Sequence, residues 1–364
     1  MKIVNVVGAR PNFMKMAPLI RAMNKRKRQI EHRLVHTGQH YDQDMSANFF
    51  KQLEIPEPDV NLGVGTGSHA EQTAKIMIEF EKVLLQYKPD VIVVVGDVNS
   101  TIACSLVASK MGVEIAHVEA GLRSFDRTMP EEINRVLTDA ISDYLFTTEA
   151  GANENLKREG IGPEKIFFVG NVMIDTVVHC LNQIKDSRLP FDLHKREYAV
   201  VTLHRPSNVD DPAVLGKILE AFHRISLKIK LVVPLHPRTG KNVITFGLKD
   251  KLDQIARNAI ISGPIGYLEM LALVRSARFV LTDSGGLQEE TTYLGVPCLT
   301  MRENTERPST IEMGTNELVG NDLDALFRHF EKIMSNDFKK GRIPPLWDGK
   351  AAERIVDVLL SRHE

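Results

Sequence analysis

The chain has 364 residues, of which 43% are hydrophobic and 26% charged, and its formal net charge is −1. At about 150 residues per domain, this length predicts two domains, each large enough for its own core. The balanced charge gives no overall attraction to nucleic acid or to acidic membranes, so neither is expected as a partner.

Cysteine usage and apolar run lengths favour a reducing, aqueous compartment. Cys104, Cys180 and Cys298 lie in apolar runs without a C-x-x-C pair, which predicts buried thiols and no disulfide framework. The first residues already form a strand pattern, KIVNVVG, and no apolar run is long enough to span a bilayer. We therefore expect a cytoplasmic protein.

Short β-branched runs alternate with helical patterns, which predicts an α/β protein with parallel sheets covered on both faces. In the first half we expect strands at 2–7, 32–37, 90–95, 114–119, 143–148 and 166–170, and helices near 14–26, 68–87, 99–110 and 131–141. In the second half we expect strands at 199–203, 230–235, 259–262, 278–282, 297–301 and 317–320, and helices near 211–227, 268–276, 286–294 and 321–335.

The polar segment 180–197 is where we expect the junction between the domains to finish. The prediction is a Rossmann-like domain at 1–170 and a second one at 171–345, facing each other across a cleft. A C-terminal helix within 346–364 is expected to pack back on the first domain.

The first strand is followed by VVGARPNFMKMAP, which lacks the G-x-G-x-x-G fingerprint of dinucleotide-binding domains. That absence argues against a nicotinamide cofactor. Arg10 and Lys15 flank this loop at the carboxyl end of a strand, where ligands bind in open α/β sheets. They could neutralise a phosphate or, as readily, be surface charges.

Three acidic residues follow strands or begin helices in the first half. Asp97 ends VIVVVGD, Glu119 ends EIAHVE, and Glu131 follows Pro130. Carboxylates in unlike environments are what proton transfer needs. The alternatives are a helix cap for Asp97, a salt bridge with Arg123 for Glu119, and a surface charge favoured by the helix dipole for Glu131.

Histidine and arginine residues follow two strands of the second half. His204 and Arg205 come directly after AVVTL, and His236 with Arg238 comes after LVVPL. Their positions suggest a pyrophosphate and sugar environment. No His and carboxylate spacing on one element indicates a metal site, so no metal or other cofactor is expected.

The segment TDSGGLQEE, residues 282–290, couples a candidate phosphate cradle to two carboxylates one helical turn further on. Ser284, Gly285 and Gly286 are read as a tight turn that opens a helix, whose first N–H groups attract an anion. Glu290 stands where a carboxylate could accept both hydroxyls of a ribose. The alternative is a capped helix with solvated glutamates.

Taken together, these motifs resemble the non-hydrolysing UDP-N-acetylglucosamine 2-epimerases, in family order from Arg10 to Gly314. The resemblance rests on GARPNFMKMAPL, HTGQHYDQDM, KPDVIVVVGDVNSTIA, HVEAGLRSF, MPEEINRVLTD, GNVMIDT, TLHRPSN, PLHPRT, LTDSGGLQEE and TERPSTIEMGT. It implies two Rossmann-like domains in the glycosyltransferase-B arrangement, a homodimer, and interconversion of UDP-N-acetylglucosamine with UDP-N-acetylmannosamine without a nicotinamide.

The resemblance also assigns roles to individual residues. Asp97, Glu119 and Glu131 would be the acid/base carboxylates, and His204 would act near the leaving pyrophosphate. The nucleotide sugar would be held by Arg10, Lys15, His236, Ser284, Gly285, Gly286, Glu290 and Arg307.

TLHRPSN and PLHPRT are also similar to the branch of the family that epimerises UDP-2,3-diacetamido-glucuronate, which leaves the substituents at C3 and C6 of the sugar open. The retained QEE and TERP favour the simpler substrate. A glycosyltransferase of the same architecture and a non-catalytic nucleotide-sugar sensor are the competing classes, although a transferase would need only one base.

In bacterial members of the family, a second UDP-N-acetylglucosamine binds beside the active site and activates the enzyme. Gln39, His40, Arg205 and His236 match that second site. Asp42 stands where a further Gln would align, and an acid beside a pyrophosphate should repel it. We therefore predict that this chain binds the second nucleotide sugar weakly or not at all.

Overall fold

The structure is a computed structural model that describes residues 1–38, 53–184 and 189–363. The chain divides into two compact units, a first unit of Met1–His179 with Pro345–Glu364 and a second unit of Cys180–Pro344. The boundary that we expected after residue 170 falls instead after His179, within a helix. Between its gaps, the described chain contains no helix that is long and apolar enough to cross a membrane.

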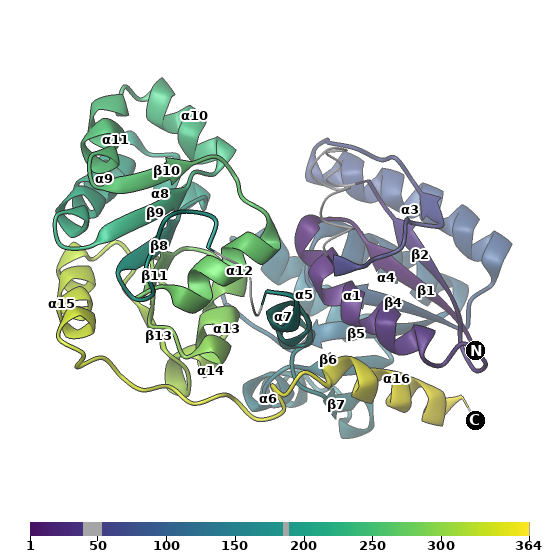
Figure 1. Cartoon of the computed structure of the whole chain (residues 1–364). Coiled ribbons are helices and arrows are strands. Elements are labelled where there is room, and N and C mark those ends of the chain that lie inside the picture. Colours follow the sequence, from purple (N-terminus) through teal and green to yellow (C-terminus); the bar gives the residue numbers. More distant parts are fainter. Residues whose placement is uncertain (39–52, 185–188, 364) are drawn as a thin grey trace. The chain divides into compact units, whose positions relative to one another are not determined.

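The first unit contains, among its described residues, a seven-stranded parallel sheet with the order β3-β2-β1-β4-β5-β6-β7 (Figure 1). Its strands are β1 (Lys2–Val7), β2 (Glu31–His36), β3 (Val60–Asn61), β4 (Val91–Val95), β5 (Glu114–Ala120), β6 (Tyr144–Thr147) and β7 (Ile166–Phe168). Its helices are α1 (Arg10–Asn24), α3 (His69–Tyr87), α4 (Asn99–Met111), α5 (Pro130–Ile141), α6 (Ala150–Arg158), α7 (Val172–Gln183), which runs on into the second unit, and α16 (Ala351–Arg362), with a 3₁₀ turn η1 (Pro163–Lys165).

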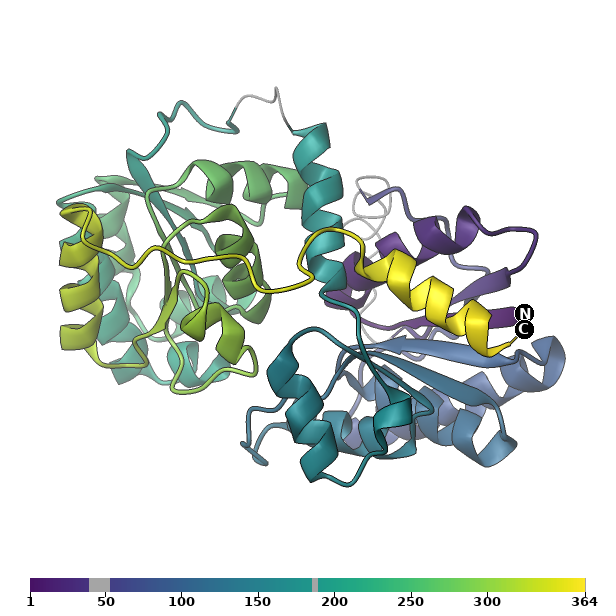
Figure 2. The ribbon, with the colours of Figure 1, turned by 90° about the horizontal axis from the view of Figure 1, so that it is seen from below.

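Helices cover both faces of this sheet because its strands are apolar on both sides. All five residues of β4 are buried, as expected for a central strand of a parallel sheet. Val4 and Ile92 belong to the core that α3 and α4 cover, whereas α1 and α16 pack against each other. Figure 2 shows α16 in yellow beside α1 in purple, where Lys25 and Arg26 form ion pairs with α16. The C-terminal helix thus belongs to the first unit.

The second unit contains, in the part of the chain that the structure describes, a six-stranded parallel sheet with the order β10-β9-β8-β11-β12-β13. Its strands are β8 (Tyr198–Thr202), β9 (Lys230–Pro234), β10 (Ala259–Ser262), β11 (Val280–Thr282), β12 (Cys298–Thr300) and β13 (Asn316–Leu318). Its helices are α8 (Pro206–Val209), α9 (Pro212–Ser226), α10 (Pro237–Thr245), α11 (Lys249–Ala256), α12 (Tyr267–Ser276), α13 (Gly285–Leu294), α14 (Pro308–Glu312) and α15 (Leu323–Met334).

Alternate residues of β8 point to opposite cores of the second unit. Val201 packs with α9 and α15, whereas Val200 packs with α12 and α13. The strand order of this sheet is that of a Rossmann fold, and the first sheet has the same order with one added strand. The predicted α/β class with two Rossmann-like units is therefore confirmed.

Candidate functional site

Each sheet reverses its strand order at one point, between β1 and β4 in the first unit and between β8 and β11 in the second. In open α/β sheets, ligands bind at the carboxyl ends of the strands beside such a reversal. In the second unit Thr202 pairs with Thr282 at this place. The residues that follow the two strands, His204 and Asp283, should therefore lie side by side.

Asp283 is fully buried and binds the segment that follows β8. Its carboxylate accepts hydrogen bonds from the backbone N–H groups of His204 (2.9 Å) and Arg205 (2.8 Å) and from the side-chain amide of Asn208 (3.1 Å). The Nδ1 atom of His204 lies 2.8 Å from Oδ1. Burial alone would raise the pKa of Asp283, but the contacts with His204 and the N–H groups outweigh it and lower the pKa. Asp283 thus fixes both predicted residues at the strand end.

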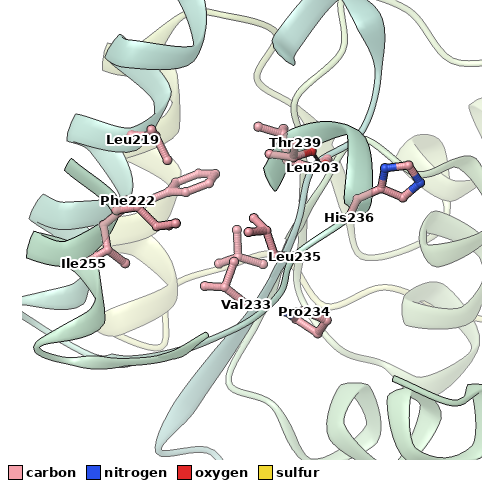
Figure 3. A pocket seen from close by; sticks show the side chains of 11 residues that line it. Leu203, Leu219, Phe222, Val233, Pro234, Leu235, His236, Thr239 and Ile255 are labelled. Carbon is pink, nitrogen blue, oxygen red and sulfur yellow. Dashed lines mark hydrogen bonds between the residues drawn. The ribbon is translucent and has the colours of Figure 1, made fainter. Parts of the chain in front are cut away.

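The imidazole rings of His204 and His236 lie near each other, with 5.5 Å between their centroids. His236 is the N-cap of α10, and its Nδ1 accepts a hydrogen bond from the N–H of Arg238 (3.2 Å). Figure 3 shows the ring of His236 directed away from Phe222 and the other apolar side chains of a small cavity. That cavity has about 20 Å³, room for about one water molecule, and cannot be the ligand site.

Ser284 occupies the N-cap position of α13, without a side-chain cap of its own. The first N–H groups of a helix have no intrahelical partner, so this end of α13 suits an anion. A Cβ atom at Gly285 would lie 2.8 Å from Nη1 of Arg307. Arg307 is nearly buried and contacts the carboxylates of Glu306 (2.5 Å) and Glu289 (2.9 Å). Glycine therefore lets the guanidinium approach the first turn.

Glu290 is buried, so the interpretation of this residue as a solvated glutamate is wrong. The hydroxyl of Tyr267 donates a hydrogen bond to its Oε1 atom (3.2 Å), whereas Oε2 has no partner among the described residues. Burial, reinforced by the charge of Glu289, raises the pKa of Glu290 to about 8. One carboxylate oxygen is thus left for a ligand donor.

Glu119 lies in a β-bulge at the carboxyl end of β5. The pairing with β6 shifts between Val118 and Ala120, and Glu119 has a φ of 76°. Such a conformation is uncommon for a residue with a side chain and is found at functional sites. The bulge directs the carboxylate to the ammonium group of Lys15, with which it forms a buried ion pair.

Two sequence-based interpretations change with this geometry. Lys15 is buried and its ammonium group pairs with Glu119, so the interpretation of Lys15 as a surface charge is wrong, and its role in holding phosphate stays a prediction. The alternative pairing of Glu119 with Arg123 is wrong, because Arg123 contacts Asp139 (2.7 Å) and Glu159 (2.5 Å).

Asp97 follows β4 and is held by α5. Its carboxylate accepts hydrogen bonds from Nη2 (2.8 Å) and Nε (3.2 Å) of Arg135. Arg135 is almost fully buried and also contacts Glu132, whose carboxylate accepts the N–H of Ser124 (3.0 Å). The N-cap of α4 is Val98, not Asp97. Asp97 is thus fixed by a buried arginine.

A cavity of about 270 Å³ opens beside Asp97 within the first unit. This volume is close to that of small-molecule pockets. Asp97, Glu131, Asn99 and His69 are among the residues that line it. Two of the three predicted carboxylates therefore share one cavity, which the sequence alone could not establish.

Some predicted residues lie outside what the structure describes. These are Gln39 and His40, together with the side chain of Arg10, whose backbone begins α1. Elsewhere along the described chain, no group of three or more His, Cys, Asp or Glu residues is placed to hold a metal ion.

Asp283, Arg135 and Tyr267 were missed by the sequence analysis. Asp283 and Arg135 lie within quoted motifs and Tyr267 lies outside them, but only the strand and helix neighbours identify their partners. The spacing of Arg135 four residues after Glu131 is a usable signal, because residues at i and i+4 share a helix face.

A family model described as UDP-N-acetylglucosamine 2-epimerase matches residues 21–360. The UDP-N-acetylglucosamine 2-epimerase of Methanocaldococcus jannaschii is 48% identical over 366 residues, which cover 99% of each chain. The UDP-2,3-diacetamido-2,3-dideoxy-D-glucuronate 2-epimerase of Pseudomonas aeruginosa is 43% identical, again over 99% of each chain.

A crystal structure of the M. jannaschii enzyme in complex with UDP-GlcNAc and UDP has a TM-score of 0.91 and 46% identity, covering 99% of this chain and all of that one. The match thus extends from sequence to fold over the full length. The chain belongs to the UDP-N-acetylglucosamine 2-epimerase family.

Proposed function

We propose that the protein inverts C2 of UDP-N-acetylglucosamine to give UDP-N-acetylmannosamine, and the reverse. The observation that carries this proposal is the cavity that Asp97 and Glu131 share, in a chain 48% identical to a UDP-N-acetylglucosamine 2-epimerase. A carboxylate that can accept a proton and a second one that can return it are what inversion at a carbon requires.

The reaction proceeds by elimination and re-addition of UDP. A base takes the proton from C2, the electron pair forms the C1–C2 double bond, and the bond between C1 and the phosphate oxygen breaks, giving UDP and 2-acetamidoglucal. UDP then adds back to C1 while an acid protonates C2 on the opposite face. One base cannot conveniently serve both faces, so at least two carboxylates are needed.

The carboxylates differ in their surroundings, which supports unlike acid/base roles. Asp97 contacts a buried arginine and is partly exposed, whereas Glu119 is buried against Lys15. Glu131 stands at the start of α5 and lines the cavity. Environments that separate pKa values allow one group to act as base while another acts as acid. The assignment of these three residues is part of the proposal.

In the second unit, we assign the phosphates to the first turn of α13, with Ser284, Gly285 and Gly286, and the ribose to Glu290. The unpartnered Oε2 atom of Glu290 supports the ribose contact. His204, which Asp283 positions, would stabilise the departing pyrophosphate, as preorganised charges and donors do in general. A homodimer, as the family resemblance implies, is also part of the proposal, and sedimentation equilibrium would test it.

A second candidate substrate is UDP-2,3-diacetamido-glucuronate. The observation in its favour is the 43% identity with an epimerase of that sugar over 99% of both chains. The same elimination would serve both sugars, because the substituents at C3 and C6 take no part in bond making or breaking.

Incubating the purified chain with each nucleotide sugar alone tests the proposal. C2 inversion of UDP-N-acetylglucosamine, followed by NMR of the anomeric protons, is the expected result. A requirement for an acceptor would identify a glycosyltransferase, and binding without turnover a sensor. Inversion of the diacetamido-glucuronate sugar only would move the substrate to the second candidate.

A further inference from the structure

Helix α5 carries three charged residues at four-residue spacing, Glu131, Arg135 and Asp139. Residues at i, i+4 and i+8 lie along one side of a helix. Glu131 lines the cavity and Arg135 holds Asp97, whereas Asp139 is fully buried at the other end of the row. Asp139 has no place in the proposed proton transfers, so its burial calls for another explanation.

Asp139 contacts the end of β5 directly and reaches the segment after β4, which carries Asp97, only through His117. Its Oδ1 atom lies 2.6 Å from Nδ1 of His117 on β5, and Nε2 of the same ring lies 2.9 Å from the carbonyl oxygen of Gly96, the residue before Asp97. Its Oδ2 atom accepts the N–H of Gly121, just after the bulge at Glu119 (3.0 Å). The carboxylate of Asp139 thus holds β5 on both sides of its bulge, and His117 extends this contact to Gly96.

The hydrogen-bond partners of His117 indicate the protonation state of its imidazole ring. An ionised carboxylate and a backbone carbonyl are acceptors only, so both ring nitrogens of His117 must carry a proton. Burial alone would raise the pKa of Asp139, but His117 and Arg123 outweigh it and lower the pKa, which keeps the carboxylate charged. Arg123 also pairs with Glu159, which is partly exposed, so this buried guanidinium lies between two carboxylates.

We propose that the His117–Asp139 pair is a positioning device that fixes the distance between Asp97 and Glu119, with His117 held as a buried imidazolium. The proposal rests on the proposed function, since it assumes that these two carboxylates transfer protons. Figure 1 shows α5 beside β5, the strand that carries His117 and Glu119. Neither His117 nor Asp139 need touch the substrate.

The variants Asp139→Asn and His117→Gln test the proposal. A misplacement of about 1 Å can cost about 10²-fold in rate, so kcat for C2 inversion should fall by about that factor. KM and the affinity for UDP should change little, because the proposed UDP contacts lie in the second unit. A wild-type kcat in both variants would overturn the positioning role, as would an equal loss of kcat and of UDP binding, which indicates general loss of structure.

Asp143→Asn is a matched control. Asp143 accepts the N–H of Ile115 (3.0 Å) at the other end of β5 and is partly exposed. Asp143 is also a carboxylate that accepts a backbone N–H of β5, but this contact is at the amino end of the strand, remote from Asp97 and Glu119. Its kcat should stay within a factor of about two of wild type, and a fall as large as that of Asp139→Asn would overturn the claim that the carboxyl end matters.

A measurement on the unaltered protein does not depend on the variants folding. In ¹⁵N-histidine NMR spectra, one histidine should show a proton on both ring nitrogens, and His117→Gln should remove that signal. An unprotonated ring nitrogen at His117 would show that this residue is not an imidazolium. If the unaltered chain inverts no sugar, the proposed function fails, and the NMR result still decides the state of His117.

Discussion

Glu290 is a carboxyl group that the second unit buries before any ligand is bound. Its pKa of about 8 lies above the ordinary value of 4.5, so the folded protein binds this proton more tightly than the unfolded chain does. The contribution of Glu290 to stability is therefore most favourable below about pH 4.5, and it declines as the pH rises to about 8.

Replacing Glu290 by Gln should remove this loss of stability at higher pH, because the amide does not titrate. We expect Glu290→Gln to melt at a higher temperature than wild type at pH 8 without ligand, and the difference to shrink toward pH 5. The same variant should bind UDP more weakly by roughly 1–3 kcal/mol, because Gln offers one acceptor oxygen where the carboxyl group of Glu290 offers two. Calorimetry measures both quantities, and Glu269→Gln, at an exposed helix cap, is the control. Unchanged UDP affinity would remove Glu290 from the ligand site.

The three proposed acid/base residues differ from Glu290 in what their loss should do. Asp97→Asn, Glu119→Gln and Glu131→Gln should each keep UDP binding and lose about 10²–10⁴-fold in turnover. Glu79→Gln, on an exposed surface pair, should change neither. Steady-state kinetics with UDP titrations provide the test. Near-normal rates in all three variants would show that the carboxylates are not the acid/base groups.

At the residue scale, the sequence identified side chains but not their partners. Asp97, Glu119 and Glu131 could be found because they follow strands or open a helix. Their contacts with Arg135 and Lys15 could not, since these depend on which strands and helices are neighbours in space. Asp283 was overlooked for the same reason.

At the scale of elements, the bulge in β5 and the turn after β4 meet where Gly96 has a φ of 69°. A Cβ atom at this position would lie 3.0 Å from Nζ of Lys15 and 3.4 Å from Oε2 of Glu119. Both the backbone conformation and the close approach therefore favour glycine. A side chain at position 96 would enter the space that the ion pair of Lys15 and Glu119 fills.

Gly96→Ala should thus lower both stability and turnover. Gly112→Ala is matched to it, because Gly112 has a φ of 71° but nothing within 4 Å of its Cβ position. The left-handed conformation should cost each variant roughly 1–2 kcal/mol in the free energy of unfolding. Urea denaturation measures this loss of stability. Only Gly96→Ala should also lose turnover, which steady-state kinetics measure. Equal turnover in the two variants would mean that crowding at Lys15 and Glu119 does not matter.

Long, strongly periodic elements were predictable, as α3, α9 and α15 show, because one apolar face of each helix faces a sheet. The shorter helices α6, α10 and α11 were missed, since eight or nine residues carry only two turns of a pattern. Helix α7 was missed although its apolar residues have helical spacing, because its last residues lie in the segment 180–197, which was read as a junction.

At the scale of the whole molecule, the alternation of strands and helices predicts two α/β units but not the order of the strands. That order places β1 beside β4 and β8 beside β11, and so defines the two reversals of strand order beside which open α/β sheets bind ligands. The first unit also includes α16, from the far end of the chain. This helix is held by packing between residues more than 300 positions apart, such as Lys25 and Glu353.

Regulation is a further property of the whole enzyme. Asp42 lies outside the described residues, and its charge predicts weak binding of a second nucleotide sugar. Assays started with pure UDP-N-acetylmannosamine should therefore proceed without a lag. A long lag that a trace of UDP-N-acetylglucosamine abolishes would show that the activating site is intact.

Turnover in heavy water tests the central claim most directly, because elimination releases the C2 proton to a carboxylate that exchanges with solvent. Starting from UDP-N-acetylglucosamine alone, we predict deuterium at C2 of both the UDP-N-acetylmannosamine formed and the recovered substrate, measured by NMR and mass spectrometry. Retention of the original hydrogen at C2 throughout inversion would contradict the elimination, and the absence of any inversion would contradict the epimerase itself.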